Sequence, residues 1–409
     1  MKLGILTFHS QLNYGGVLQC WALKQALTRL LKEKGKRKSE KQDEVVVVDR
    51  WLDEKNAVLR GALAGGWKGW AKLFIRGLLG CGDFGKLLRT IRTIRFVRGL
   101  GLTKAHFYRW EELGCGGEGA CRPTIAGEDL DLLVVGSDQV WHGGDWGDPR
   151  PYLLEGAPEM RAIAYAASFG LKELPKDMRE LYRRGLGRFS AISCREQEGV
   201  EICRGLGFAA AHVVDPTLLV GLDDWRELVG GGGEGTRRPT TRTLVCYFID
   251  VDLKAAMPEL ERFAAEQNCH VEVLSNDSFL LPLPRSASAF AEKLLSSRVK
   301  ICRGYGPKEF VRALSRATWT LSDSFHAAMF SAIFSRNMRF LRPANDLRRV
   351  MFARVEEFAE KCIEGEFFVD DVRQALSSFA SGEVVAYNRD QISAMRAESL
   401  KWIECHVDK

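Results

Sequence analysis

The residue best placed to do chemistry is a histidine at the point where a predicted strand meets a predicted helix. His326 follows an apolar strand expected over 318–323 and lies in the first turn of a helix expected over 325–334. Free backbone N–H groups and the positive end of the helix dipole lie beside such a residue, so it can hold a phosphate and transfer a proton. A histidine that only caps the helix would fit the same position, and the residues alone leave both interpretations open.

Two more strand ends carry charged side chains. Asp138 lies in the segment GSDQVW, which directly follows the apolar run LLVV, and Arg195 follows a second run, AISC. An aspartate there can accept the proton of a hydroxyl group, and an arginine can bind a carboxylate or a phosphate through paired hydrogen bonds. The alternatives are a helix-capping role for Asp138 and an ion pair between Arg195 and Glu196.

Two loops that contain glycine complete the set of candidates. The segment 13–16, Asn-Tyr-Gly-Gly, separates the first strand from the first helix, and Tyr305-Gly306 precedes a helix that begins with Pro307. Glycine lets the backbone approach a ligand, and a helix start offers N–H groups to an anion. Neither loop has the spacing of a dinucleotide-binding or nucleoside-triphosphate-binding loop, so those functions lose most of their support. A tight turn without a ligand is the simpler interpretation of 13–16.

The elements that must position these side chains alternate between strand and helix. Apolar, strand-like runs are expected at 3–8, 45–50, 131–138, 162–170, 191–196, 212–220, 243–250, 270–276, 299–304 and 318–323. Helical stretches separate most of them, which is typical of a mostly parallel α/β sheet. Ligands of such sheets bind beyond the carboxyl ends of the strands, and the candidate residues lie there.

A glycine-rich stretch interrupts the alternation at residues 229–242 and is expected to link two domains. We therefore assign residues 1–228 to an N-terminal Rossmann-like domain and residues 243–345 to a C-terminal one, with a ligand cleft between them. Residues 346–409 are expected to form a helical tail that packs back on the N-terminal domain.

The composition fits a soluble protein of two domains. The 409 residues are 46% hydrophobic and 27% charged, and the chain is longer than a single core usually grows. No apolar run approaches the ~20 residues that span a bilayer. The start, MKLGILTFHSQ, is expected to form a first strand and not a signal peptide. The expected location is therefore cytoplasmic.

Positive charge is concentrated in an insertion within the first domain, at about residues 55–110. From Lys55 to Arg109 the chain has twelve Lys and Arg residues against one acid, Asp83. The segment 66–80 places aromatic side chains on one helix face and basic ones on another, as in a helix that lies on an anionic membrane surface. The alternative is an insertion that packs its aromatic face on the protein and leaves a solvated basic face. No nucleic-acid recognition motif accompanies the charge, so no nucleic-acid partner is expected.

Seven segments, taken in order, resemble the polysaccharide pyruvyl transferase family. They are ILTFHSQLNYGGVLQCWAL, LLVVGSDQVWH, IAYAASFG, SCREQEG, VVDPTLLV, GPKEF and LSDSFHAAMFSAIF. The resemblance covers about residues 1–335 and rests on the order and spacing of the segments. It implies an α/β, GT-B-like fold of two Rossmann-like domains that face a central cleft. It also implies phosphoenolpyruvate as the donor, whose enolpyruvyl group forms a pyruvate ketal across two sugar hydroxyls with release of phosphate.

The resemblance also implies roles for the candidate residues. The expected catalytic residues are His326 and Asp138. Donor binding is expected from Arg195, Ser324, Phe325, Tyr305 and Gly306, and acceptor binding from Asn13, Tyr14, Gln139 and Trp141. The expected acceptor is a glycan or lipid-linked oligosaccharide destined for the cell surface, as in an exopolysaccharide or capsule, and the segment 66–80 would hold the enzyme at the inner face of the membrane. The implied reaction requires no metal ion and no redox cofactor.

One position departs from the pattern of the family. Some members have Arg-Leu-His where this chain has Ser324-Phe325-His326, so binding of the donor phosphate would depend more on Arg195, the helix amides and Ser324. Two other functions stay open on the same architecture: a GT-B glycosyltransferase that uses a nucleotide-sugar, and a catalytically silent relative that binds glycans.

Overall fold

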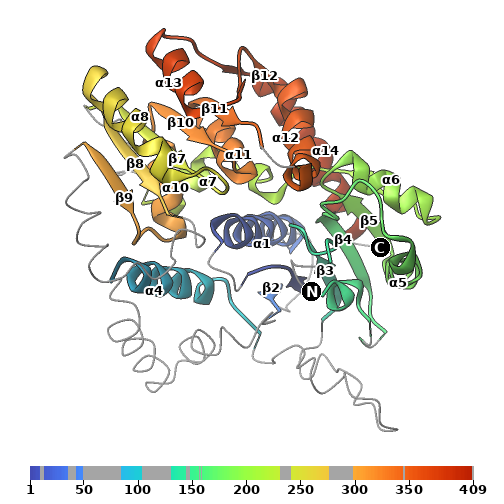
Figure 1. Cartoon of the computed structure of the whole chain (residues 1–409). Coiled ribbons are helices and arrows are strands. Elements are labelled where there is room, and N and C mark those ends of the chain that lie inside the picture. Colours follow the sequence, from blue (N-terminus) through green and yellow to red (C-terminus); the bar gives the residue numbers. More distant parts are fainter. Residues whose placement is uncertain are drawn as a thin grey trace.

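Two parallel sheets, each covered by helices, dominate the computed structural model of this chain, and helix α1 (Tyr14–Gly35) runs between them (Figure 1). The residues that the structure describes are 1–9, 13–35, 43–48, 84–103, 130–143, 148–155, 157, 159–230, 241–275, 298–343 and 346–407. The predicted membrane-binding segment 66–80, most of the insertion 55–110 and most of the linker 229–242 lie outside the described residues.

The first sheet has six described strands in the order β2-β1-β3-β4-β5-β6. They are β1 (Lys2–Leu6), β2 (Glu44–Val47), β3 (Leu132–Val135), β4 (Ala162–Ala167), β5 (Ala191–Cys194) and β6 (Ala211–His212), accompanied by α1, α4 (Phe84–Arg98), α5 (Arg179–Leu186), α6 (Gln197–Gly205) and α7 (Leu222–Leu228). Strand β3 reads LLVV and is buried throughout, as expected of a parallel strand with helices on both faces. Because β1 pairs with β2 on one side and β3 on the other, the strand order reverses between β1 and β3.

The second sheet also has six described strands, in the order β13-β11-β10-β7-β8-β9. They are β7 (Thr243–Tyr247), β8 (His270–Leu274), β9 (Val299–Cys302), β10 (Trp319–Ser322), β11 (Asn337–Leu341) and β13 (Phe368–Val369), with helices α8 (Leu253–Glu266), α10 (Pro307–Arg316) and α11 (Phe325–Phe334). Here the order reverses between β7 and β10, because β7 pairs with both β8 and β10. Ligands bind at such reversal points in open α/β sheets.

The C-terminal region is more mixed than the helical tail expected for residues 346–409. It contains α12 (Asp346–Cys362), α13 (Val372–Ala380) and α14 (Arg389–Val407), and also β13 and the antiparallel pair of β12 (Ile363–Glu364) with β14 (Ala386–Tyr387). Strand β13 pairs with β11, so this part of the region extends the second sheet beyond residue 345. Both β11 and β13 were missed from the sequence. The strands β12 to β14 have only two residues each, too few for an alternating or apolar pattern to emerge.

Helix α14 turns back to the first domain. The backbone N–H of Val214, beyond β6, donates to Ser399 Oγ, and Arg396 Nε donates to the carbonyl oxygen of Leu218. Arg161 also donates to the carbonyl oxygen of His406. The region after residue 345 is therefore in contact with both domains.

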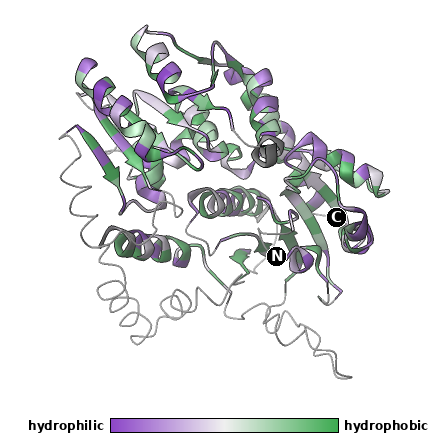
Figure 2. Ribbon diagram, viewed as in Figure 1, coloured by the Kyte–Doolittle hydropathy of each residue, from purple (hydrophilic) through white to green (hydrophobic). Residues whose placement is uncertain are grey.

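The hydropathy of helix α11 explains why it lies in the interior of the protein (Figure 2). Helix α11, with the sequence FHAAMFSAIF, is apolar on every side and all its residues are buried. A helix without a polar face must be surrounded by protein. Its first turn therefore carries His326 into the interior.

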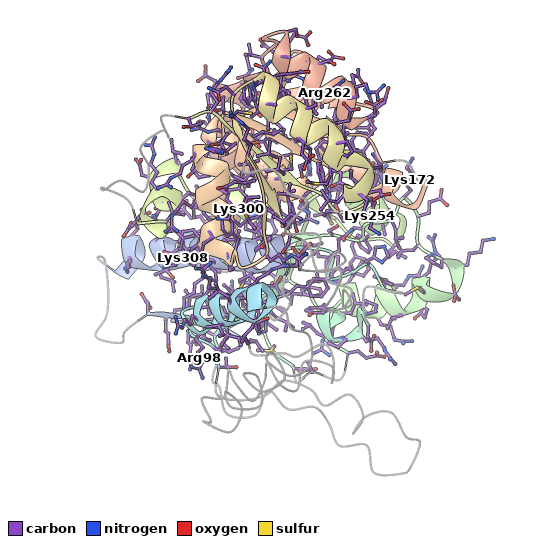
Figure 3. All side chains as sticks on the ribbon, turned by 60° about the vertical axis from the view of Figure 1, so that its left-hand side comes forward. Arg98, Lys172, Lys254, Arg262, Lys300 and Lys308 are labelled. Carbon is purple, nitrogen blue, oxygen red and sulfur yellow. The ribbon has the colours of Figure 1, made fainter. Side chains whose placement is uncertain are left out.

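Helix α4 is the described part of the basic insertion and packs against the body of the protein. Its Arg89 lies over the ring of Tyr14, with the guanidinium carbon 4.5 Å from the ring centroid, and Arg92 donates to the carbonyl oxygen of Gly304 at 2.7 Å. Exposed basic side chains occur on this helix, as at Arg98, and on other elements, as Figure 3 shows. Among the described residues no helix is both long and apolar enough to cross a membrane.

Candidate active site

Three strand ends and one helix start bring charged side chains together. Asp138 follows β3, Arg195 follows β5, Asp215 follows β6, and His326 lies in the first turn of α11, after β10. Arg195 Nη1 donates to Asp215 Oδ2 at 2.9 Å, and His326 Nε2 lies 3.8 Å from the same oxygen. Arg195 Nη2 also lies 3.6 Å from Asp138 Oδ1. The two domains therefore meet at Asp215. Asp138, after β3, and His326, after β10, lie at the reversal points of their sheets.

His326 is held against the first helix of the other domain. Its ring packs on Gly15, where a Cβ atom would lie 2.5 Å from the ring carbon Cγ and nearer still to Nδ1. Only glycine fits at that point of α1. The ring is 10% exposed, and burial lowers its pKa although Asp215 and Asp138 partly offset the effect. The histidine is therefore mainly neutral near pH 7 in the free protein.

Asp215 and Arg195 form a buried ion pair with further support. Burial alone would raise the pKa of Asp215, but His326 and Arg195 and hydrogen bonds from Thr217 together hold it below its usual value. Burial would likewise lower the pKa of Arg195, and the carboxylates of Glu196, Asp215 and Asp138 more than offset this. Both groups are therefore charged, and their ion pair holds the Asp215 carboxylate in place beside His326.

Asp138 adopts an unusual backbone conformation. Its φ is 71°, a left-handed value that only glycine, asparagine and aspartate adopt readily. The carbonyl oxygen of Asp138 accepts hydrogen bonds from Ser168 and Val140, and its Oδ1 accepts one from the N–H of Gln139. Strained backbone of this kind is often found at functional sites. Here it directs the carboxylate to Arg195 and Gly16.

A second arginine enters the site from α12. The guanidinium carbon of Arg354 lies 4.7 Å from the centroid of the Phe325 ring, and that of Arg195 lies 5.0 Å from it. Both arginines also approach Glu196 Oε1, at 3.8 Å for Arg354 and 4.0 Å for Arg195. Phe325 thus has a guanidinium group of each arginine beside its ring.

Several N–H donors in this cluster have no hydrogen-bond partner. They are Nε and Nη2 of Arg195, Nε2 of His326, and Nε and Nη1 of Arg354. Buried donors are nearly always satisfied in folded proteins, so these are suited to an oxyanion. A narrow pocket of about 30 Å³ is lined by Arg195, Asp215, Phe325 and Arg354. Within the described ranges no group of three or more His, Cys, Asp and Glu side chains is arranged to hold a metal ion.

The other predicted donor residues lie in different surroundings. Ser324 occupies the N-cap position of α11 without a capping hydrogen bond from its side chain, and its N–H donates to Ser322 Oγ. Tyr305 donates from its hydroxyl to Glu272, and Gly306 caps α10, packed against Arg92. The structure gives neither Tyr305 nor Gly306 a contact with Arg195 or His326.

The predicted acceptor residues are divided in the same way. Trp141 is completely buried in the core of the first domain, packed on Phe169, and Tyr14 is 1% exposed. Both side chains make hydrogen bonds within the protein: the Trp141 indole donates to the carbonyl oxygen of Tyr152, and the Tyr14 hydroxyl donates to that of Tyr305. Asn13 is exposed and accepts a hydrogen bond from Gly15, and Gln139 is adjacent to Asp138 with its Nε2 unpaired.

Asp215 and Arg354 were missed from the sequence. Asp215 lies in the segment VVDPTLLV, where an acid directly before a proline at a strand end is a signal that could have identified it. Arg354 lies in the middle of a helix with the sequence DLRRVMFARVEEFAEKC, and nothing in that pattern distinguishes it from its basic neighbours.

The chain matches one protein-family model and several solved structures. A family model described as polysaccharide pyruvyl transferase matches residues 13–343. No curated protein matches the chain significantly. UDP-GlcNAc 2-epimerase from Methanocaldococcus jannaschii is a structural relative with a TM-score of 0.50 and 12% identity, over 93% of this chain and 92% of that one. This likeness shows the fold, a GT-B-like pair of Rossmann-like domains.

Two further structures are more distant. UDP-N-acetylglucosamine 2-epimerase from Rickettsia bellii has a TM-score of 0.49 and 10% identity, over 100% of this chain and 96% of that one. MurG from Acinetobacter baumannii has a TM-score of 0.39 and 10% identity, over 98% and 94%.

Proposed function

Because the chain belongs to the polysaccharide pyruvyl transferase family, we propose that it moves the enolpyruvyl group of phosphoenolpyruvate onto two hydroxyls of a sugar. The acceptor is a cell-surface polysaccharide or its lipid-linked precursor. The observation that carries the proposal is that Arg195 and His326, from different domains, meet at Asp215. Nitrogen atoms of both side chains there have no hydrogen-bond partner. Such donors suit the carboxylate and the phosphate of this donor.

The reaction places clear demands on the site. Two C–O bonds form at the carbon that carries the phosphate, and the C–O bond to phosphate breaks. Of the two hydroxyl protons, one is transferred to the methylene carbon, which becomes a methyl group, and the other leaves with the phosphate. The site therefore needs an acid near the methylene carbon, a base near the attacking hydroxyl, and N–H donors for the departing phosphate.

His326 is the proposed acid, and its environment supports a proton-linked mechanism. The cluster contains three carboxylates, Asp138, Glu196 and Asp215, against the two arginines. With His326 neutral, the acids outnumber the cations by one. An incoming donor adds negative charge, so its binding favours the protonated imidazole. The histidine then holds a proton when the donor is bound.

Asp138 is proposed to serve the acceptor. A carboxylate cannot donate a hydrogen bond to the anionic donor, whereas an attacking hydroxyl needs a proton acceptor within hydrogen-bond reach. The left-handed backbone at Asp138 holds this carboxylate in place beside Arg195. Its proposed role is therefore to deprotonate the sugar hydroxyl.

The test is an incubation of the protein with phosphoenolpyruvate and candidate lipid-linked glycans, with phosphate release as the readout. Arg195→Ala should weaken donor binding in calorimetry by about 2–4 kcal/mol, because a buried anion loses its charged partner. Arg195→Lys retains the charge in case the Ala variant does not fold. Arg373→Gln, at a side chain that is 72% exposed, is a control for net charge. Unchanged donor affinity in the Arg195 variants would contradict the proposal.

The same incubation separates the other two functions. Release of a nucleotide from a nucleotide-sugar, without use of phosphoenolpyruvate, would identify a glycosyltransferase. Binding of the glycan without release of either product would identify a silent relative. We also propose, from the sequence of the segment 66–80, that the enzyme is held at the inner membrane face where a lipid-linked acceptor is confined.

A further inference from the structure

Arg354 lies outside the segment that the family model matches, yet inside the candidate site. It belongs to α12, which packs against α11 and α14. Its guanidinium group shares two neighbours with Arg195, namely the ring of Phe325 and the oxygen Oε1 of Glu196. Two cations are therefore directed to one place, one from the first domain and one from the C-terminal region.

The surroundings of Arg354 are unfavourable for a cation when no ligand is bound. The side chain is 13% exposed, and Nε and Nη1 have no hydrogen-bond partner. Burial lowers the pKa of Arg354 to about 10, and the charge of Arg195 acts in the same direction. A buried charge without its full set of hydrogen bonds costs free energy. An acceptor placed beside both arginines would supply hydrogen bonds that they lack in the free protein.

We propose that Arg354 binds an oxyanion of the donor jointly with Arg195, so that the C-terminal region completes the donor site. The inference rests on the proposed function, since that function supplies the anion. An oxyanion between the two guanidinium groups would accept hydrogen bonds from both arginines and offset the repulsion between their charges. The carboxylates of Glu196 and Asp215 stay with their existing partners, the hydroxyls of Ser168 and Thr217.

The pocket beside the two arginines has room for small polar groups. Its volume of about 30 Å³ holds one or two water molecules, so an oxygen of an oxyanion can lie next to Arg195 and Arg354. Arg195 is held beside this pocket by its ion pair with Asp215, and Arg354 lies beside it on α12.

The test measures binding of two probes, inorganic phosphate and phosphoenolpyruvate, by calorimetry. Arg354→Gln and Arg354→Met should each weaken both by about tenfold or more, as expected from loss of a charge-assisted hydrogen bond. Arg354→Lys should retain part of the affinity, because the charge remains but the planar pair of donors is lost. The exposed Arg373→Gln should bind as the unchanged protein does.

Thermal unfolding separates binding from a purely structural role. Without ligand, Arg354→Met should melt at the same temperature or higher, since it removes a poorly satisfied buried cation. Stabilisation by phosphate should be lost in that variant. Normal affinity for both probes in all Arg354 variants would overturn the inference.

Failure of the inference and failure of the proposed function give different results. If Arg195→Ala loses phosphoenolpyruvate and the Arg354 variants do not, only the role of Arg354 is wrong. If the unchanged protein binds neither probe, the proposed donor itself is wrong. If Arg354→Met does not fold, the Lys and Gln variants still give the comparison.

Discussion

Gly15→Ala offers a direct test of the geometry at His326. The added Cβ would lie 2.5 Å from Cγ of the imidazole, against 3.4–4 Å for ordinary contact. The backbone of α1 cannot retreat easily, because the buried face of this helix packs in the core. The ring must therefore move by about 1 Å, which removes it from Asp215 Oδ2. A misplacement of that size at a reacting group costs about 10²-fold in turnover.

The assay has a binding part and a kinetic part. Loss of one charge-assisted hydrogen bond, about 1.5–3 kcal/mol, should weaken phosphoenolpyruvate binding about 10–150-fold. The free energy of unfolding should fall by about 2 kcal/mol at most, since overpacking costs about 1–3 kcal/mol and the higher helix propensity of alanine offsets about 1 kcal/mol. Gly205→Ala is the matched control, since a Cβ there meets nothing within 4 Å. If Gly15→Ala binds the donor and releases phosphate as the unchanged protein does, His326 is not the group that the site depends on.

Three further predictions concern protons and the membrane. Asp138→Asn, which tolerates the same left-handed backbone, should lower phosphate release while donor affinity stays equal or rises; loss of donor binding would contradict an acceptor role. Because burial lowers the pKa of His326 and a bound anion raises it, donor binding near pH 7 should take up a proton and weaken as pH rises. Calorimetry in buffers of different ionisation enthalpy should detect this uptake, and His326→Asn should lack it; equal uptake in both proteins would mean that another group titrates. Vesicle sedimentation should show binding that needs anionic lipid, falls with salt, and drops when Trp67, Trp70 and Phe74 are changed to Ser; equal recovery with neutral vesicles would favour a packed insertion.

The long, strongly patterned elements were predictable because their residues specify them locally. The helix expected over 325–334 has those bounds in the structure, and each of the ten expected strands has a counterpart of four or more residues except at 212–220. That segment forms only the two-residue strand β6 before Asp215 and Pro216 end it. Strand β11, with the sequence NMRFL, was missed because Arg339 interrupts its apolar run. The structure buries this arginine with Ser378 as a partner, a contact 39 residues away.

Position at a strand end predicted which charged residues meet. It did not distinguish side chains that lie in the site from side chains that pack in the core. Asp138, Arg195 and His326 converge, as their places in the sheets required. Trp141 follows the same strand as Asp138, and its large ring is buried in the core of the first domain. The direction of a side chain after a strand depends on turn geometry, here including the left-handed residue at 138, which the sequence pattern does not specify.

The charge of the proposed donor explains why the site expected from the sequence needs a further cation. Phosphoenolpyruvate carries a phosphate and a carboxylate, and the sequence supplied Arg195 as the one clear cation for both, with Ser324 in place of an arginine. Burial of such an anion requires further positive charge. That requirement predicts a second cation but not its position, because the cation comes from a remote helix with no motif around it. Arg354 lies 159 residues after Arg195 in the sequence. In the structure it lies beside Phe325 and Glu196, which are also neighbours of Arg195. Charge balance and tertiary packing together therefore identify a residue that neither the motif nor the family match contains.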